Sequence, residues 1–438
     1  MEISMSGNVA AQPRAVRLSI ALSGIASAVA TLSCAAVDRA PAPVLEGRAV
    51  LPVNTYAPGP PSGALFTKSP NGITFPTPSQ PVEGFSALVS GRHAREYLGM
   101  LDNGFGTKAN SQDFLIRAYY IEPDFKTAKG GTGTVVVKDF ISFRDPGHKI
   151  GFAIINEATT DRLLTGGDID PESMQRANNG DYWIGDEFGP WLLHFDATGI
   201  LLEPPYPVPG TLMAFPIRGD LMAPSNPFLG TGAPGQLDSR GFEAMAITPD
   251  GAQLYATLEG PTMADADSSR RVVLEFSIRD RAFTGRTWWY HTEQSAHFIA
   301  DLGALDEHRL VAIERDNRLG LDAAFRSLYV VDLRSVDNDG FLKKERAVDL
   351  TVVPDPNLIS QPPIHAGDVG LGNPFRVTCE SIEAILVLDA ERLLLGCDNN
   401  FPNKGRNPDL ADDSEFIVVK VPGLSKTSAE RGSRGGAL

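Results

Sequence analysis

The chain has 438 residues, of which 43 are glycine and 33 are proline, and its formal net charge at pH 7 is −15. This much glycine and proline disfavours a helical bundle and is typical of a turn-rich β fold. The negative charge and the lack of a basic patch argue against nucleic acid as a partner, whereas an acidic surface is compatible with binding cations.

Residues 1–36 have the pattern of a signal peptide. Arg14 and Arg17 precede an apolar run that is too short to cross a bilayer, and small residues follow it. We therefore expect an exported protein, periplasmic or extracellular, with no transmembrane segment elsewhere. Cys34 is a candidate lipid-anchor cysteine, although Thr31 stands where such a signal normally has leucine.

Residues 37–81 are rich in proline and alanine and predict an extended lead-in. From residue 82 to residue 422, short β-rich runs alternate with turn signals. The polar residues 423–438 predict a flexible tail. The clearest units of paired strands are 84–103, 168–199, 240–260, 298–333 and 380–400.

These units share one arrangement of acidic residues. A first strand carries an acid near its start, a turn follows, and a second strand ends on Asp or Glu. Glu243 pairs with Glu259 in this way, and Glu383 with Asp398. Such repetition predicts an all-β fold, a β-propeller whose inner strands line a channel. A pair of β-sandwiches is the rival architecture, but it gives no reason for acids to recur at one strand end.

Chain length gives the expected number of blades. Roughly 400 exported residues, at about 40–50 or more residues for each blade, predict six blades, with seven as the alternative. Acids at equivalent strand ends would then converge on one mouth of the channel. Like charges so close repel unless a cation or a shared proton relieves them.

A calcium site is the chemistry that such a group of carboxylates predicts, because Ca²⁺ accepts six to eight hard oxygen ligands. Zinc is disfavoured, since cysteine is scarce and the chain has only 7 histidines. For any one carboxylate alone, a turn cap or a surface charge remains the alternative. The candidate metal ligands are Glu172, Asp186, Glu187, Glu243, Glu259, Glu314, Glu383 and Asp398.

Basic residues lie beside these acids in the sequence. Arg240, Arg315 and Lys404 could contact a phosphate or carboxylate of a substrate, because cationic side chains bind such groups. An arginine paired with a glutamate across blade ends is the alternative. The chain has no G-x-S-x-G elbow and no P-loop, so no nucleophile or nucleotide motif is available.

Cys379 and Cys397 flank one predicted hairpin. A disulfide between them is geometrically possible and an exported compartment permits it. Two buried free thiols are the alternative.

Several stretches resemble a known family. They are D-P-E-S, D-Y-W-I-G-D-E-F-G-P-W, R-G-F-E-A-M-A-I-T-P-D-G, A-I-E-R-D-N and L-L-L-G-C-D-N-N-F-P. Together they resemble the phytase-like family, described as "esterase-like activity of phytase", over residues 80–422. The resemblance implies a propeller that hydrolyses phosphoric or carboxylic esters. Similarity to calcium-dependent propeller phytases implies Ca²⁺ held at the channel mouth. The first unit departs from the pattern, with Ser86 where later units carry Glu.

Two functional hypotheses follow. The first is an exported, divalent-cation-dependent hydrolase of a small-molecule ester, in which Glu187 or Glu243 acts as general base on a metal-activated water. The second is a non-catalytic propeller that binds a ligand or partner and uses calcium as a structural staple. We expect a monomer in either case.

Overall fold

The computed structural model describes residues 41–66 and 70–426. The expected signal peptide, Cys34 and residues 427–438 of the tail lie outside these ranges. Helix in the described ranges is confined to three short 3₁₀ turns, η1 (Pro70–Gly72), η2 (Gly210–Leu212) and η3 (Gly320–Asp322). None of the described helices is long and apolar enough to cross a membrane.

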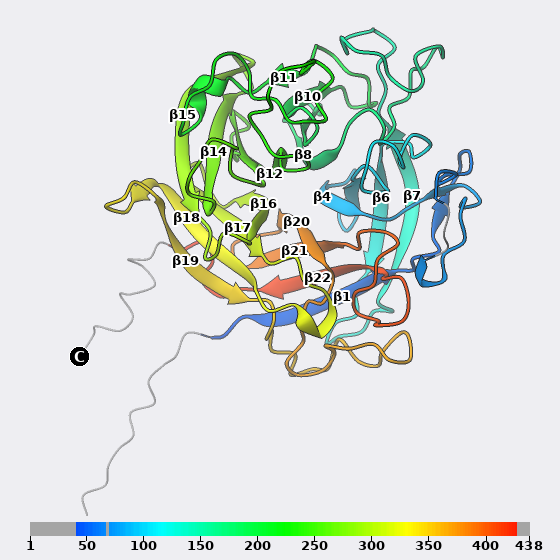
Figure 1. Ribbon diagram of the computed structural model, residues 1–438. Helices are drawn as coiled ribbons and strands as arrows, with labels where there is room; N and C mark the ends of the chain where they lie inside the picture. The colour runs from blue at the N-terminus through cyan, green and yellow to red at the C-terminus, as the bar shows by residue number, and fades with distance from the viewer. Residues whose placement is uncertain (1–40, 67–69, 427–438) are drawn as a thin grey trace, which may run out of the picture. The chain divides into compact units, whose positions relative to one another are not determined.

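The described strands form five four-stranded blades around a centre (Figure 1). In the first four blades, the strands run in chain order from the centre outward. These blades are β4 (Phe85–Ser90), β5 (Tyr97–Leu101), β6 (Arg117–Asp124) and β7 (Thr134–Ser142); β8 (Pro171–Arg176), β9 (Tyr182–Asp186), β10 (Trp191–Phe195) and β11 (Tyr206–Pro207); β12 (Phe242–Ile247), β13 (Gln253–Leu258), β14 (Arg270–Ser277) and β15 (Ala282–His291); and β16 (Phe298–Ala304), β17 (Arg309–Arg315), β18 (Arg326–Val336) and β19 (Leu342–Asp349).

The fifth blade joins the two ends of the described chain. It consists of β20 (Ser381–Val387), β21 (Arg392–Asp398), β22 (Ser414–Lys420) and the early strand β1 (Val44–Leu51). Strand β1 pairs antiparallel with β22, and a single parallel pair, Val50 with Thr134, links it to β7. The inner strands β4, β8, β12, β16 and β20 contact one another in turn, and β20 contacts β4, so the ring is closed.

The closing strand corrects one expectation from the sequence. Residues 44–51, which lie within the predicted lead-in, form a mostly buried strand of the fifth blade. Arg48 of β1 pairs with Glu415 of β22 at 2.5 Å, and both side chains are buried. A short second hairpin of β2 (Tyr56–Ala57) and β3 (Gln80–Pro81) lies in the same stretch.

The all-β propeller class is confirmed, but the described residues form five blades where six were expected. The expected number of blades assumed that most residues of the chain belong to blades. Long connections instead separate the blades, such as residues 208–241 between β11 and β12 and residues 350–380 between β19 and β20. These connections lie at the same end of the ring as the starts of the inner strands.

Tight turns close the opposite end of the blades. Between β12 and β13, Asp250 accepts hydrogen bonds from the amide of Ala252 (2.9 Å) and the hydroxyl of Thr248 (2.6 Å). Gly251 completes this turn at φ 71°, in the left-handed region that favours glycine. Apolar side chains such as Trp183 and Phe276 fill the space between neighbouring sheets and hold the blades together.

Candidate metal centre in the propeller channel

A β-bulge interrupts each of the five inner strands near its start. At the bulge one residue has no cross-strand partner, because the register shifts by one position there. A bulge re-aims the side chain that it carries. The five bulge residues are Ser86, Glu172, Glu243, Ala300 and Glu383.

Each second strand supplies a matching position. The last residue before each bulge pairs with a residue of the second strand, and the residue after that partner is polar or charged in every blade. In the fifth blade, for example, Ile382 pairs with Cys397, and Asp398 follows Cys397. In blade order these residues are Asp102, Glu187, Glu259, Arg315 and Asp398. The bulge residue of the first strand and the residue at the end of the second strand thus give each blade two channel positions. This arrangement explains why acids scattered along the sequence meet at one mouth of the channel.

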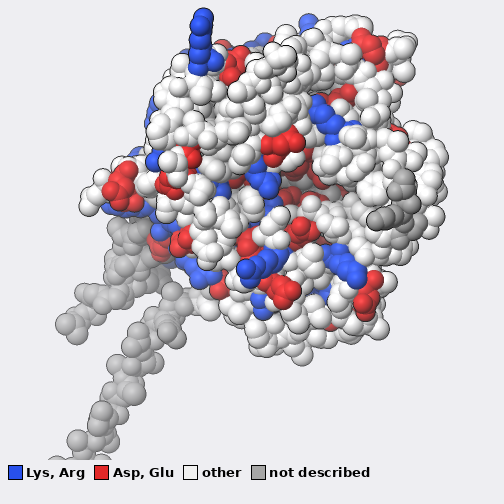
Figure 2. Space-filling model, in the orientation of Figure 1, with Lys and Arg blue, Asp and Glu red and all other residues white. Residues whose placement is uncertain are grey.

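The acids converge in two overlapping groups. Oxygen atoms of Asp170, Glu172 and Glu187 lie within 4.8 Å of one another, and so do those of Glu187, Glu243 and Glu259. Glu187 therefore belongs to both groups. Figure 2 shows acidic side chains inside the hollow at the centre of the ring, with basic side chains close to them.

Two arginines neutralise the second group. The buried guanidinium of Arg315 lies 3.6 Å from both Glu243 and Glu259 and pairs with Glu383. Arg240, whose side chain is 32% exposed, pairs with Glu259 at 2.5 Å. In contrast, no ion pair joins an arginine or lysine to Asp170, Glu172 or Glu187 in the described part of the chain. The first group therefore has no direct ion pair with a basic side chain, although the charge of Lys108 acts on Asp170 and that of Arg240 acts on Glu187.

The pKa values of these acids are raised because the carboxyl groups are desolvated close to one another. Burial, with the charges of Asp170 and Glu243 added, raises the pKa of Glu172 well above its usual range. Burial raises the pKa of Asp170 to about 7, although a hydrogen bond with Glu172 acts in the opposite direction. Burial and the charge of Glu259 raise the pKa of Glu187 well above normal. A cation among these carboxylates would remove the penalty of ionising them.

Unsatisfied oxygens point to the same place. Asp170 Oδ1, Glu187 Oε1 and Glu243 Oε1 are buried and have no hydrogen-bond partner among the described residues. Buried polar atoms are nearly always paired, and an unpaired carboxylate oxygen is costly. The donor set consists of hard oxygens, which fits Ca²⁺ or a similar divalent ion.

Three residues expected at the site from the sequence do not join the channel group. Glu314 accepts a hydrogen bond from Tyr290 (2.7 Å) and pairs with Lys344 (2.8 Å), away from the channel acids. Asp186 accepts hydrogen bonds from the amides of Asp170 (2.8 Å) and Gly189 (2.6 Å), which is a turn-capping role. Lys404 donates to the carbonyl of Pro408 at 2.7 Å.

Register explains the place of Glu314. Ile299 pairs with Glu314, so the next residue, Arg315, takes the channel position of the fourth blade. A shift of one residue along a strand moves a side chain to the opposite face. The other expected residues, namely Glu172, Glu187, Glu243, Glu259, Glu383, Asp398, Arg240 and Arg315, interact with one another at the channel mouth.

The candidate site residues predicted from the sequence leave out Asp102, Asp170 and Lys108, although Asp170 lies among the carboxylates that flank the 168–199 hairpin. Asp102 directly follows β5, so the rule that a second strand ends on an acid could have found it. Burial raises its pKa well above normal, and the charge of Asp170 adds to that rise. Lys108 lies in the loop after β5, and the charges of Asp186, Asp168 and Asp170 act on its ammonium. No sequence signal marked Lys108.

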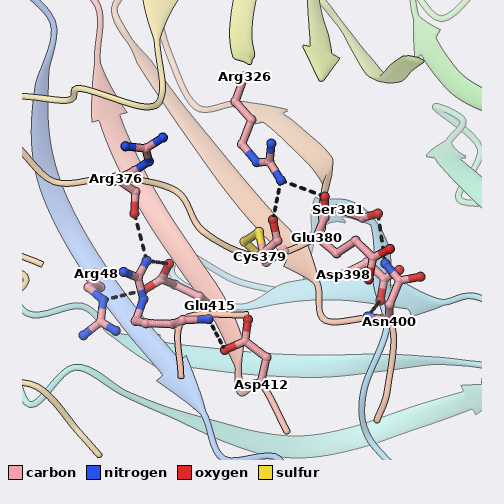
Figure 3. The surroundings of a disulfide bond; sticks show 12 residues. Arg48, Arg326, Arg376, Cys379, Glu380, Ser381, Asp398, Asn400, Asp412 and Glu415 are labelled. Carbon is pink, nitrogen blue, oxygen red and sulfur yellow. Dashed lines mark hydrogen bonds and ion pairs between the residues drawn. A yellow bond between two sulfur atoms is a disulfide. The ribbon is translucent and has the colours of Figure 1, made fainter. Parts of the chain in front are cut away.

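A disulfide joins Cys379 and Cys397 next to this site, with a Cα–Cα distance of 6.1 Å (Figure 3). Cys397 directly precedes Asp398, whose neighbour Asn400 donates a hydrogen bond to Ser381 at 2.9 Å. Arg326 donates to the carbonyls of Cys379 (2.7 Å) and Glu380 (2.9 Å). The disulfide and Arg326 thus fix the segment that leads to Glu383.

A separate pocket has Cys379 of the disulfide in its lining. Arg48 and Arg406 line it, and both guanidinium groups pair with the buried Glu415 at 2.5 Å. Both guanidinium groups are already engaged with Glu415, and Asp368, Asp412 and Asp413 also line the pocket, so this pocket offers less to a ligand than the acidic channel.

Comparisons with known proteins give one family match. A model described as "Phytase-like: Esterase-like activity of phytase" matches residues 80–401. No curated protein matches the chain. Among solved structures, a luciferin-regenerating enzyme is similar at 8% identity and a TM-score of 0.34, covering 79% of this chain and 80% of its own. Regucalcin, a calcium-binding protein from Agrobacterium tumefaciens, is similar at 11% identity and a TM-score of 0.34, covering 80% and 95%.

Proposed function

Because the chain belongs to the phytase-like family, we propose that it is an exported, divalent-cation-dependent hydrolase of small-molecule esters, phosphoric or carboxylic. The observation that carries the proposal is the acidic group formed by the buried Asp170 and Glu187 and the half-buried Glu172, in which two buried oxygens have no hydrogen-bond partner and no carboxylate has a direct ion pair with a basic side chain among the described residues. We propose this group as the core of a Ca²⁺ site, with Asp102 and Asp398 beside it.

The chemistry that the ion supplies when bound is polarisation of the ester's oxygen and a lower pKa of water. The chain's own residues do the rest. Glu243 is the proposed general base, because its Oε1 has no hydrogen-bond partner and Glu187 already belongs to the cation group. Burial raises the pKa of Glu243 well above normal, with a contribution from Glu383, which makes it a stronger proton acceptor.

The two arginines have different proposed roles. Arg240 is partly exposed and faces the channel mouth beside Glu259, so it can contact the anionic part of a substrate. Arg315 is buried among three carboxylates and would hold them together rather than touch the substrate. Lys404 has no contact with the channel acids that would support the substrate role expected from the sequence.

A second candidate function is a non-catalytic binding propeller with a structural cation. The position of Arg315 favours it, since a guanidinium that contacts Glu243, Glu259 and Glu383 links three blades without any need for turnover.

One experiment separates the two functions. Hydrolysis of p-nitrophenyl phosphate and p-nitrophenyl acetate is measured with Ca²⁺ and with EDTA, for the wild type and Glu172→Gln. The hydrolase requires calcium-dependent turnover of at least one ester that Glu172→Gln abolishes. Turnover of neither ester, with EDTA lowering only the melting temperature, favours the binding propeller.

Export is a further part of the proposal. The Cys379–Cys397 disulfide supports it, because structural disulfides persist in oxidising compartments. Fractionation of the producing cells tests it: the full-length chain should be recovered outside the cytoplasm with both cysteines oxidised. Recovery from the cytoplasm with free thiols would contradict it.

A further inference from the structure

An apolar ledge lies beside the proposed cation site. It is formed by Phe152 and Phe228, which come from two of the long connections between blades, and Ile155 follows Phe152 in the first of these connections. Phe228 is 53% exposed and Ile155 is 46% exposed. Exposed apolar side chains that gather next to a polar site are typical of ligand-binding surfaces.

The ledge is built onto β10, the strand next to β9, which ends directly before Glu187. The ring of Phe228 lies 6.2 Å from that of Trp191 and 5.9 Å from that of Phe152, and Phe152 stacks on Trp191 at 5.6 Å. Trp191 pairs across the strands with Asp186, directly before Glu187. On its other flank, the amide of Ile155 donates to Asp168 at 2.8 Å.

Backbone and side-chain bonds hold this arrangement in place. Asn226 donates to the carbonyl of Gly189 at 2.9 Å and accepts from the amide of Phe228 at 2.8 Å. Ala223 donates its amide to the same carbonyl at 3.0 Å. The loop that presents Phe228 is therefore anchored to the turn that follows Glu187.

A cation lies near both the loop that presents Phe228 and the carboxylates. The ammonium of Lys108 lies 4.6 Å above the ring of Phe188 and donates one hydrogen bond, of 2.8 Å, to the carbonyl of Ser225. An ammonium has three donors, so two have no acceptor among the described residues and can serve a ligand. The carboxylates Asp186, Asp168 and Asp170 lie close enough for their charges to act on it.

We propose that this ledge binds the apolar alcohol part of a phosphate monoester whose phosphate is held by the cation site and Lys108. The inference rests on the proposed function and names its substrate class: an amphiphilic phosphate monoester with an aromatic or alkyl group, rather than a fully polar polyphosphate. Hydrolysis of such a substrate breaks the phosphorus–oxygen ester bond; water supplies a hydroxyl group to phosphorus and a proton to the released alcohol.

Phenylphosphonate and methylphosphonate test the ledge without turnover, because neither is hydrolysed. Their binding to the full chain in Ca²⁺ is measured by calorimetry for the wild type, Phe228→Ala, Lys108→Met and Phe215→Ala. Phe215 is a matched control, since it is 45% exposed in the same connection, and its ring lies 6.0 Å from the guanidinium of Arg270 instead.

The wild type should bind phenylphosphonate more tightly, and Phe228→Ala should weaken that binding by about tenfold while methylphosphonate is unaffected. Lys108→Met should weaken both ligands to the same extent. The proposed role of the ledge would be contradicted by any of three results. These are equal affinity of the wild type for the two phosphonates, an effect of Phe215→Ala equal to that of Phe228→Ala, and binding of neither ligand. Calcium-dependent hydrolysis of p-nitrophenyl phosphate would still stand in those cases, so the two proposals fail separately.

Discussion

Glu314 and Arg315 are consecutive residues of β17, yet their side chains enter two different charged groups. Glu314 contacts His297 at 3.1 Å and Lys344 at 2.8 Å. Burial acts to raise the pKa of Glu314, but the hydrogen bond from His297 and the charge of Lys344 hold it below its usual range. Arg315 instead contacts the channel carboxylates. Because successive side chains of a strand point to opposite faces, these two neighbouring residues of opposite charge belong to two different sites.

This division predicts different responses to calcium. Glu172→Gln should remove most of the rise in melting temperature that Ca²⁺ gives the wild type, because it takes away an oxygen of the proposed site. Glu314→Gln should lower stability by about 1–3 kcal/mol, since it leaves Lys344 and His297 poorly paired, but it should keep the calcium response. Thermal unfolding of both variants in Ca²⁺ and in EDTA measures this. An unchanged calcium response of Glu172→Gln would remove the proposed site.

The pH dependence of the calcium effect is the second prediction. Burial raises the pKa of Asp170 to about 7 in the folded protein, above its value in the unfolded chain. Without metal, the stability linked to this group is therefore fully present at low pH and is lost as pH rises toward 7. Calcium requires the ionised carboxylate, so the calcium-dependent rise in melting temperature should grow between about pH 5 and pH 8.

Melting curves in Ca²⁺ and in EDTA across this pH range measure that growth. Asp170→Asn is the control, because it cannot ionise and should flatten the pH dependence contributed by this group. A calcium effect that is constant from pH 5 to pH 8 in the wild type would contradict the prediction.

The sequence was sufficient for much of the fold and of the site. Turn signals such as Asp250–Gly251 and the acids at strand ends predicted a propeller whose acids gather, because these features act locally. The channel positions of Glu243 and Glu259 followed from that pattern. The number of blades did not, since long connections such as 208–241 contain too little β pattern to separate an insertion from a blade.

Other parts of the site depend on register and on contacts between distant segments. A bulge of one residue decides whether Glu314 or Arg315 faces the channel, and no composition signal marks a bulge. The pairing of β1 with β22 joins residues more than three hundred and fifty positions apart, as the Arg48–Glu415 contact does. Lys108 reaches the site only through the packing of its loop against Phe188 and Ser225.

Arg315 carries the third prediction. Arg315→Met should destabilise the protein in EDTA by about 3–5 kcal/mol, because it leaves the buried Glu243 and Glu383 without their cation and leaves Glu259 with Arg240 alone. Calcium should restore more stability to this variant than to the wild type, since an ion can replace the lost charge. Chemical unfolding in Ca²⁺ and EDTA measures both values.

Arg326→Met is the control: it removes a buried guanidinium paired with Asp316, and calcium should not restore the stability that this variant loses. Equal recovery of the two variants would contradict the prediction.

The disulfide gives the last prediction, through two separable effects. Cys379 and Cys397 are 18 residues apart, so replacing both with alanine should cost about 3 kcal/mol of stability by relaxing the constraint on the unfolded chain. Cys397 also directly precedes Asp398, whose side chain faces the channel, so the same change should weaken calcium binding.

Calcium titration by calorimetry, at a temperature where the variant is fully folded, isolates the effect on calcium binding. Arg48→Met is a matched control, because it destabilises the same blade at Glu415 without touching the residues next to Asp398. If the cysteine variant and Arg48→Met bind calcium as tightly as the wild type, the disulfide stabilises the blade but does not position the site.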